Sequence, residues 1–280
     1  MSANVSMRDA LYEAPGPRTR RRTIIGTVVS LVLLAAGIAF VIRQFYITDQ
    51  LNPKYWSFFT RWTTWRFLLT GFWGTLKVAF IAGIIAMALG LLLMLGRISE
   101  SKILSAVCHV ITDLFRSLPS LLLIYFFFLV IPKYGIRMPA FWMITVPVAL
   151  AASGVLAEVF RAGVNAVPKG QTEAAMSIGM THGKITRKIV LPQALRIVVP
   201  SLVSQLVVVV KDTTVAYVVS YPDLMQNARV LISNYDALVS MYFVVALIYI
   251  ALNYATNQFS VYLAHRSGTQ IVSRVSENPT

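Results

Sequence analysis

Long apolar runs alternate with short polar links along most of this chain. Six runs are apolar and long enough to be membrane-spanning helices, which need roughly 20 residues to cross the hydrocarbon layer. These runs cover residues 24–42, 71–95, 114–132, 140–160, 196–220 and 238–263. The pattern predicts an all-α integral membrane protein with six transmembrane helices, because helices satisfy their own backbone hydrogen bonds within lipid.

The polar links indicate how the spans are oriented. With a cytoplasmic N-terminus, the cytoplasmic segments are residues 1–23, 96–113, 161–195 and the tail 264–280. Together with Arg116 and Arg196 at their edges, they hold 16 of the 25 Lys and Arg residues, and the outer links hold seven. Basic residues gather on the cytoplasmic side of membrane proteins, so the bias predicts a cytoplasmic N-terminus.

Composition narrows the class of protein further. The chain is 57% hydrophobic and 13% charged, with a net charge of +14. This charge could indicate nucleic-acid binding, but the basic residues lie beside apolar spans, so we expect a lipid bilayer and no nucleic acid as partner. The single cysteine and three histidines lack metal-ligand spacing, and no nucleophile–base pair is recognisable. We therefore expect no metal, no cofactor and no enzymatic activity.

The link 161–195 contains a segment that suits two short helices. Thr172 is expected to cap the first helix, with Glu173 in its first turn, where a carboxylate is favourable. Ala174 and Ala175 would give this helix a flat, exposed contact face, and Gly179 would end it in a left-handed conformation. The residues alone leave two interpretations open: a basic link resting on anionic lipids, or a docking site for a soluble partner.

Charged residues within apolar spans are the candidates for a transport path, because they are costly in lipid. We expect Glu158 to help bind the α-amino group of an amino acid, and Lys211 or Arg116 to attract its carboxylate. Lys77 and Asp212 belong to the same set of candidates. The alternative is structural, with these charges paired at interfaces or near the membrane boundary.

Several segments resemble the permease subunits of ATP-binding-cassette importers, and in particular their polar amino-acid branch. The resemblance covers about residues 70 to 235, and the third-helix motif departs from the family's Gly-Thr-Pro, with Ser117, Leu118 and Pro119 in its place. The segments are "GFWGTLKVAF" (71–80), "DLFRSLPSLLLIYFFFLVIPKYG" (113–135), "GQTEAA" (170–175), "LPQALR" (191–196) and "KDTT" (211–214).

The resemblance implies a role for the link 161–195, which we call the coupling loop. In the family this loop sits in a cleft of a cytoplasmic ATPase subunit and transmits ATP-driven closure to the membrane helices. The docking residues it implies here are Gln171, Glu173, Ala174, Ala175 and Gly179. The implied partners are a cytoplasmic ATPase dimer, a second permease subunit, identical or related, and an external amino-acid-binding protein.

The apolar spans and the resemblance together predict a domain organisation, although the resemblance does not explain the first span. Residues 71–263 would form a five-helix permease core that contains the coupling loop. Residues 24–70 would add a first transmembrane helix and an outer interfacial link. The segments 1–23 and 264–280 would be a cytoplasmic N-terminal segment and a cytoplasmic tail.

The function that follows is the permease subunit of an importer in the bacterial cell membrane, driven by ATP that a partner chain hydrolyses. Its substrate would be a polar amino acid, with glutamate favoured by the cationic charge in the spans and outer links. Two alternatives remain open at this point: a secondary transporter driven by an ion gradient, and a membrane scaffold subunit.

Overall fold

The computed structural model describes residues 16–266, and within this range it contains helices, turns and no strand. It divides into two compact units, residues 1–56 and 57–280, and each is described by itself. Residues 1–15 of the predicted N-terminal segment and 267–280 of the predicted tail lie outside the described range. The domain boundaries expected from the sequence stay a prediction.

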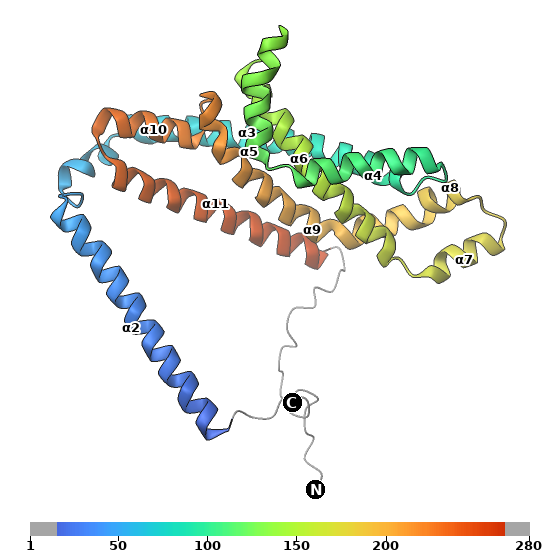
Figure 1. The fold of residues 1–280 in the computed structure, drawn as a ribbon, viewed down its shortest axis with the longest axis horizontal. Helices are drawn as coiled ribbons and strands as arrows, with labels where there is room; N and C mark the ends of the chain where they lie inside the picture. Colours follow the sequence, from blue (N-terminus) through green and yellow to red (C-terminus); the bar gives the residue numbers. More distant parts are fainter. Residues whose placement is uncertain (1–15, 267–280) are drawn as a thin grey trace. The chain divides into compact units, whose positions relative to one another are not determined.

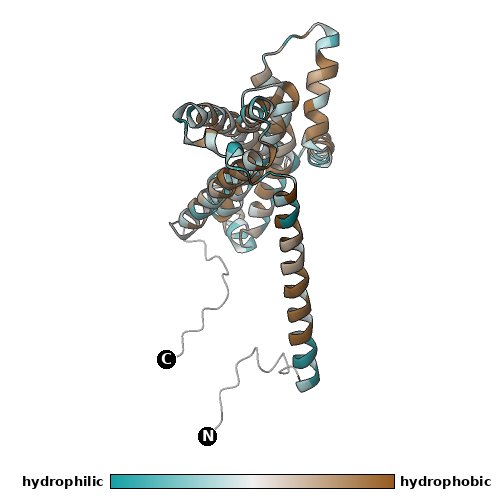
Figure 2. Ribbon diagram, turned by 90° about the vertical axis from the view of Figure 1, so that its left-hand side faces the viewer, coloured by the Kyte–Doolittle hydropathy of each residue, from teal (hydrophilic) through white to brown (hydrophobic). Residues whose placement is uncertain are grey.

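The first unit contains one long helix, α2 (Pro17–Ile47), which includes the predicted span 24–42. Proline is favoured in the first turn of a helix, since its missing N–H would have no partner there. No side chain of α2 is buried within the chain, and the mean hydropathy of its most apolar stretch is 2.6. Figure 2 shows hydrophilic first turns, which hold residues 18–22, followed by a long hydrophobic stretch. A helix that is apolar on all sides is typical of a membrane span.

The second unit is a bundle of long helices joined by short ones (Figure 1). A short 3-10 turn, η1 (Pro53–Tyr55), is the last element of the first unit and comes just before the second unit in the sequence. The elements of the second unit are η2 (Ser57–Thr60), α3 (Trp62–Arg97), α4 (Lys102–Ser117), α5 (Ser120–Tyr125), η3 (Phe126–Val130), η4 (Ile131–Tyr134), α6 (Ala140–Ala166), α7 (Lys169–Ser177), α8 (His182–Ile185), η5 (Thr186–Val190), α9 (Leu191–Asp212), η6 (Thr213–Val219), α10 (Leu224–Tyr235) and α11 (Leu238–Arg266).

The predicted fold class is confirmed. Among the described residues, five helical runs are long and apolar enough to cross a membrane, and a bent helix pair makes a sixth candidate. One of the five is continuous from His182 to Val219, because α8, η5, α9 and η6 follow one another without a break. The chain is a multi-pass membrane protein.

The third predicted span, 114–132, is wrong as a single helix. The structure has α4 before the break at Leu118 and Pro119, and the segment from Ser120 to Tyr134 leaves at an angle of 96° (Figure 1). Proline lacks a donor and restricts the residue before it, so it ends helices at that residue. Most of the predicted link 96–113 is therefore helical, and α4 packs against α3 and α6.

Helix α6 lies at the centre of the second unit, where it packs against α3, α4 and α9. The close approach of α4 to α6 depends on Gly154, because a Cβ there would lie 2.6 Å from the backbone nitrogen of Arg116 and 2.9 Å from the carbonyl oxygen of Thr112. The core is made of fully or nearly fully buried side chains, most of them from α3, α6 and α9. These include Val78, Ala82, Ala86, Val148, Leu156, Phe160, Val198 and Val209.

The two ends of the bundle differ. The coupling loop, with α7 and α8, lies at one end, and α10 lies at the other (Figure 1). At the α10 end, the Asp223 carboxylate caps α10 by accepting a hydrogen bond of 2.7 Å from the Gln226 N–H. The Asn227 side chain donates to the Phe67 carbonyl on α3 at 2.7 Å. These bonds fix α10 on the first turns of α3.

Asp223 makes the stability of this end depend on pH. It is fully buried, its second oxygen has no hydrogen-bond partner, and burial raises the pKa of its carboxyl to about 7. The tyrosines Tyr221 and Tyr249 and the Thr75 hydroxyl lie around it. Because the folded pKa is above the ordinary value of 3.8, the stabilisation is complete below that value and is lost as the pH rises through about 7.

We therefore expect the thermal unfolding midpoint of the wild-type protein in detergent to fall, relative to that of Asp223→Asn, between pH 5 and pH 8. Asparagine also caps helices well, so the variant keeps the cap without the charge. Taking the difference between the two proteins removes titrations that both share. A difference that does not change over this range would show that Asp223 is not protonated in the fold.

Candidate functional site

The coupling loop turns at Gly179. Helix α7 ends at Ser177, and Gly179 follows with a left-handed φ of +79°, as predicted. The Met180 N–H donates to the Ala175 carbonyl at 3.1 Å, and the Gly179 N–H donates to the Met176 carbonyl at 2.9 Å. This pair of bonds is a Schellman motif, which ends a helix where glycine accepts the left-handed conformation.

The start of α7 differs from the prediction. The helix begins at Lys169 after Pro168, so Thr172 is not its cap and Glu173 lies in the second turn. The signal that decides this is Pro168, because proline fixes a backbone conformation that suits a helix entry. The capping predicted for Thr172 is therefore wrong, and the helix starts three residues earlier.

The two alanines of α7 face different ways. Ala174 is exposed, whereas Ala175 is 2% exposed. Ala175 belongs to an apolar cluster that folds the loop onto the first part of α9, together with Val167, Ile185, Val190 and Ala194. The prediction that both alanines form the exposed contact face is therefore wrong for Ala175.

Most of α7 is exposed, and one of its exposed sides holds Gln171, Ala174 and, just after the helix, Ile178. These positions are three and four residues apart, which places them on one side of the helix. The Ile178 side chain is 77% exposed, and it is not among the docking residues predicted from the sequence. Met176, two residues earlier, is also 53% exposed, and exposed apolar side chains that gather on one part of a surface are typical of a surface that a partner covers.

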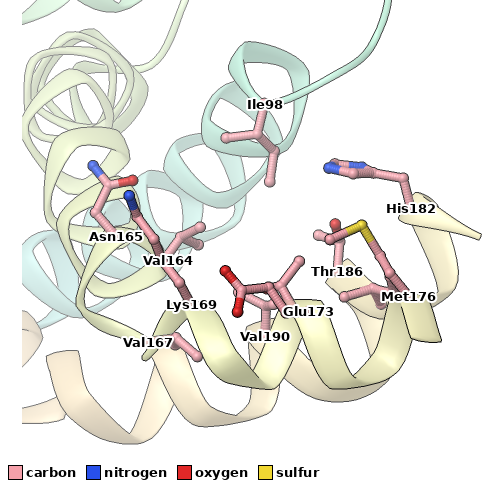
Figure 3. A pocket seen from close by; sticks show the side chains of 12 residues that line it. Ile98, Val164, Asn165, Val167, Lys169, Glu173, Met176, His182, Thr186 and Val190 are labelled. Carbon is pink, nitrogen blue, oxygen red and sulfur yellow. The ribbon is translucent and has the colours of Figure 1, made fainter. Parts of the chain in front are cut away.

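Glu173 lies on a different side of α7 from this face and lines a pocket of about 470 Å³. Figure 3 shows Glu173 and Lys169 directed into the pocket, with Asn165 of α6 on one side and His182 on the other. Ile98, just after α3, also lines it. A second pocket of about 510 Å³ shares Ile98 and His182. There, His182 Nδ1 lies 3.8 Å from Glu100 Oε1, between the coupling loop and the α3–α4 link.

The charged candidates in the spans are dispersed. Glu158 forms ion pairs with Arg97 of α3 and Arg161 of α6, and the distance between Arg161 Nε and Glu158 Oε2 is 2.8 Å. Lys77 Nζ lies 5.2 Å from the centre of the Phe141 ring, a cation–π distance.

Two of the sequence candidates, Arg116 and Asp212, line the same cavity of about 130 Å³. It lies where α4, α5, α6 and α9 meet, next to the break between α4 and α5. Ser120, at the start of α5, lines the cavity together with Asp212. The Gln205 side chain is a further polar group in the wall. Lys211, the sequence neighbour of Asp212, is exposed and is not part of this lining.

This cavity combines the groups that an α-amino acid needs. A guanidinium binds a carboxylate through two parallel hydrogen bonds, and a carboxylate accepts hydrogen bonds from an ammonium group. Arg116 itself lies 3.3 Å from Asp113, and Asp113 lies 3.0 Å from His109, so a short charged network leads away from the cavity along α4. Asp113 and His109 were not among the sequence candidates, although their spacing from Arg116 is helical.

Comparison with known proteins identifies a family. Residues 86–268 match the family model described as "binding-protein-dependent transport system inner membrane component". The chain is 36% identical over 239 residues to the glutamate transport system permease protein GluD of Corynebacterium glutamicum, covering 82% of this chain and 88% of that protein. It is 37% identical over 193 residues to the probable glutamine ABC transporter permease protein GlnP of Bacillus subtilis, covering 68% and 88%.

Solved structures give the same picture. An amino acid ABC transporter crystallised with histidines has a chain that matches with a TM-score of 0.70 and 28% identity, covering 75% of this chain and 98% of that chain. An inward-facing structure of the MetNI methionine ABC transporter matches with a TM-score of 0.62, and its 21% identity supports the fold alone.

Proposed function

Because the chain belongs to the family of binding-protein-dependent transport system inner membrane components, we propose that it is the permease subunit of an ATP-driven amino-acid importer. The observation that carries the proposal is the coupling loop, with an exposed face on α7 and a pocket behind it. A secondary transporter would have no use for such a loop. The chain would act in the inner membrane of a bacterium, with a cytoplasmic N-terminus.

The coupling loop would dock on the cytoplasmic ATPase dimer. Gln171, Ala174 and Ile178 would supply the contact surface, and Gly179 would set the turn that presents it. Ala175 would hold the loop in shape from within. Glu173 would act from the pocket side, where a basic side chain of the ATPase could reach its carboxylate.

The cavity between Arg116 and Asp212 would be the resting place of the substrate in the membrane. Arg116 would bind the α-carboxylate, and Asp212 would bind the α-ammonium group. Glu158 was the sequence candidate for the ammonium group, but its two arginine partners favour a structural role. Lys77 and Lys211 would contribute positive potential.

Glutamate is the favoured substrate. The chain resembles a glutamate permease over most of its length, and the cationic charge of the spans suits an acidic amino acid. A second permease subunit would complete the path, and an external amino-acid-binding protein would deliver the substrate.

Uptake of radiolabelled L-glutamate by proteoliposomes containing the assembled transporter tests the proposal. We expect uptake to require ATP inside and the binding protein outside, and Asp212→Asn to lower its rate on the order of a hundredfold, as losing a charged hydrogen-bond partner costs about 3 kcal/mol. Ser204→Ala is the matched control, because its exposed hydroxyl bonds only the Pro200 carbonyl of its own helix. Uptake driven by a proton gradient without ATP would contradict the proposal.

A further inference from the structure

Helix α4 carries four polar side chains along one side. Lys102, His109, Asp113 and Arg116 fall within an arc of about 60° on a helix of 3.6 residues per turn. All four side chains remain partly or largely exposed, with 56% of the His109 side chain and 48% of the Arg116 side chain accessible. We call these four residues the α4 stripe.

The other exposed side of α4 is apolar. Ile103 is 80% exposed, Val107 49%, Val110 67% and Leu114 52%. A third side is buried, where Cys108 and Thr112 pack within the bundle. The helix therefore has one side suited to lipid, one packed on protein, and one charged side that neither of these explains. Charges facing hydrocarbon cost several kcal/mol each, so the α4 stripe must face water or a polar surface.

The position of the α4 stripe connects two features described above. Its last residue, Arg116, lines the cavity that also contains Asp212. Its first residue, Lys102, lies beside the α3–α4 link, whose Glu100 is next to His182 of the coupling loop. The stripe thus runs from the cavity to the coupling-loop end of the bundle, over about 21 Å at 1.5 Å per residue.

We propose that the α4 stripe lines the water-filled inner half of the translocation path and conducts an acidic solute from the Arg116–Asp212 cavity to the cytoplasm. This inference rests on the proposed function and deepens it. Lys102 and Arg116 supply two positive charges at the ends of the stripe. Between them the Asp113 carboxylate lies 3.0 Å from His109 Nδ1 and 3.3 Å from Arg116 Nε, so the one acidic side chain of the stripe is paired within the stripe.

Cysteine accessibility tests the inference in the assembled transporter in inverted membrane vesicles. The background is Cys108→Ala, which removes the only native thiol. Two matched pairs differ in face but not in depth: Lys102→Cys with Ile103→Cys, and His109→Cys with Val110→Cys. The probe is a negatively charged methanethiosulfonate, which reacts with the thiolate form in water.

We expect each stripe cysteine to react on the order of tenfold faster than its neighbour, because an apolar environment disfavours the thiolate. Equal rates within both pairs, or faster reaction at Ile103→Cys and Val110→Cys, would overturn the inference. Slow reaction of all four cysteines, as expected if a second subunit covers the stripe, would also overturn it. If His109→Cys fails to assemble, Ala106→Cys at the edge of the stripe replaces it. If the transporter takes up glutamate with ATP but the paired cysteines are labelled at equal rates, only the inference about the α4 stripe is contradicted. If the stripe cysteines are labelled fast but no uptake occurs, only the proposed function is contradicted.

Discussion

Glu158→Gln is expected to destabilise the protein by roughly 3–5 kcal/mol, because it leaves two partly buried arginines without their shared counter-charge. Glu158 is bonded to Arg97 on α3 and Arg161 on α6, and only 11% of the Arg97 side chain is exposed. The effect should appear as a large drop in the thermal unfolding midpoint of the purified protein in detergent.

The double variant Arg97→Gln with Glu158→Gln is the control for this prediction. It removes both partners of the more buried pair, so we expect it to recover part of the lost stability. A role of Glu158 in substrate binding predicts a different result. If Glu158→Gln unfolds at the wild-type temperature but no longer supports uptake, Glu158 acts on the amino acid, as its charge in an apolar span first suggested.

The second large effect concerns the two alanines of α7, which are sequence neighbours in different environments. Ala174→Arg is expected to leave the loop folded and to lower the amount of ATPase subunit that co-purifies on the order of tenfold, about 1.4 kcal/mol of binding. Its Cβ lies on the exposed face with Gln171 and Ile178. A long charged side chain there would separate the docking surfaces.

Ala175→Arg is expected to act through the fold of the loop. It would place a cation among Val167, Ile185 and Val190, where an unpaired charge costs at least about 2 kcal/mol. Limited proteolysis of the purified chain should then cut within 166–190, and Ala174→Arg should resist cleavage as the wild type does. If Ala174→Arg retains the ATPase, the docking face is not on this side of α7.

The spans were predictable from the sequence because their signal is a simple one. Each of α2, α3, α6, α9 and α11 contains an uninterrupted apolar run, and such runs have few places other than lipid or a core. Helix α4 was not predicted, because it lacks such an uninterrupted run. Lys102, His109, Asp113 and Arg116 interrupt its apolar residues, so a count of runs reads it as a link, whereas its periodicity is that of an amphipathic helix.

The site was predictable only in part. Gly179 could be read from the sequence, because a left-handed turn needs glycine and the requirement is local. The inward side of Ala175 is set by Val190 and Ala194, which lie on the following helix, and no local rule contains that information. Likewise, Arg116 and Asp212 are far apart along the chain, and only the packing of α4 and α9 on α6 brings them to one cavity.

The unbroken run from His182 to Val219 has a mechanical consequence. It begins in the coupling loop and passes the cavity at Asp212, about 45 Å further along at 1.5 Å per residue. A helix resists compression along its axis, so a displacement of the coupling loop would be passed along this run to the cavity. The π-helical turn η5 (Thr186–Val190) and Pro200 within α9 are the places where this run would bend. A movement of the coupling loop on the cytoplasmic side would thereby shift the Asp212 carboxylate within the membrane.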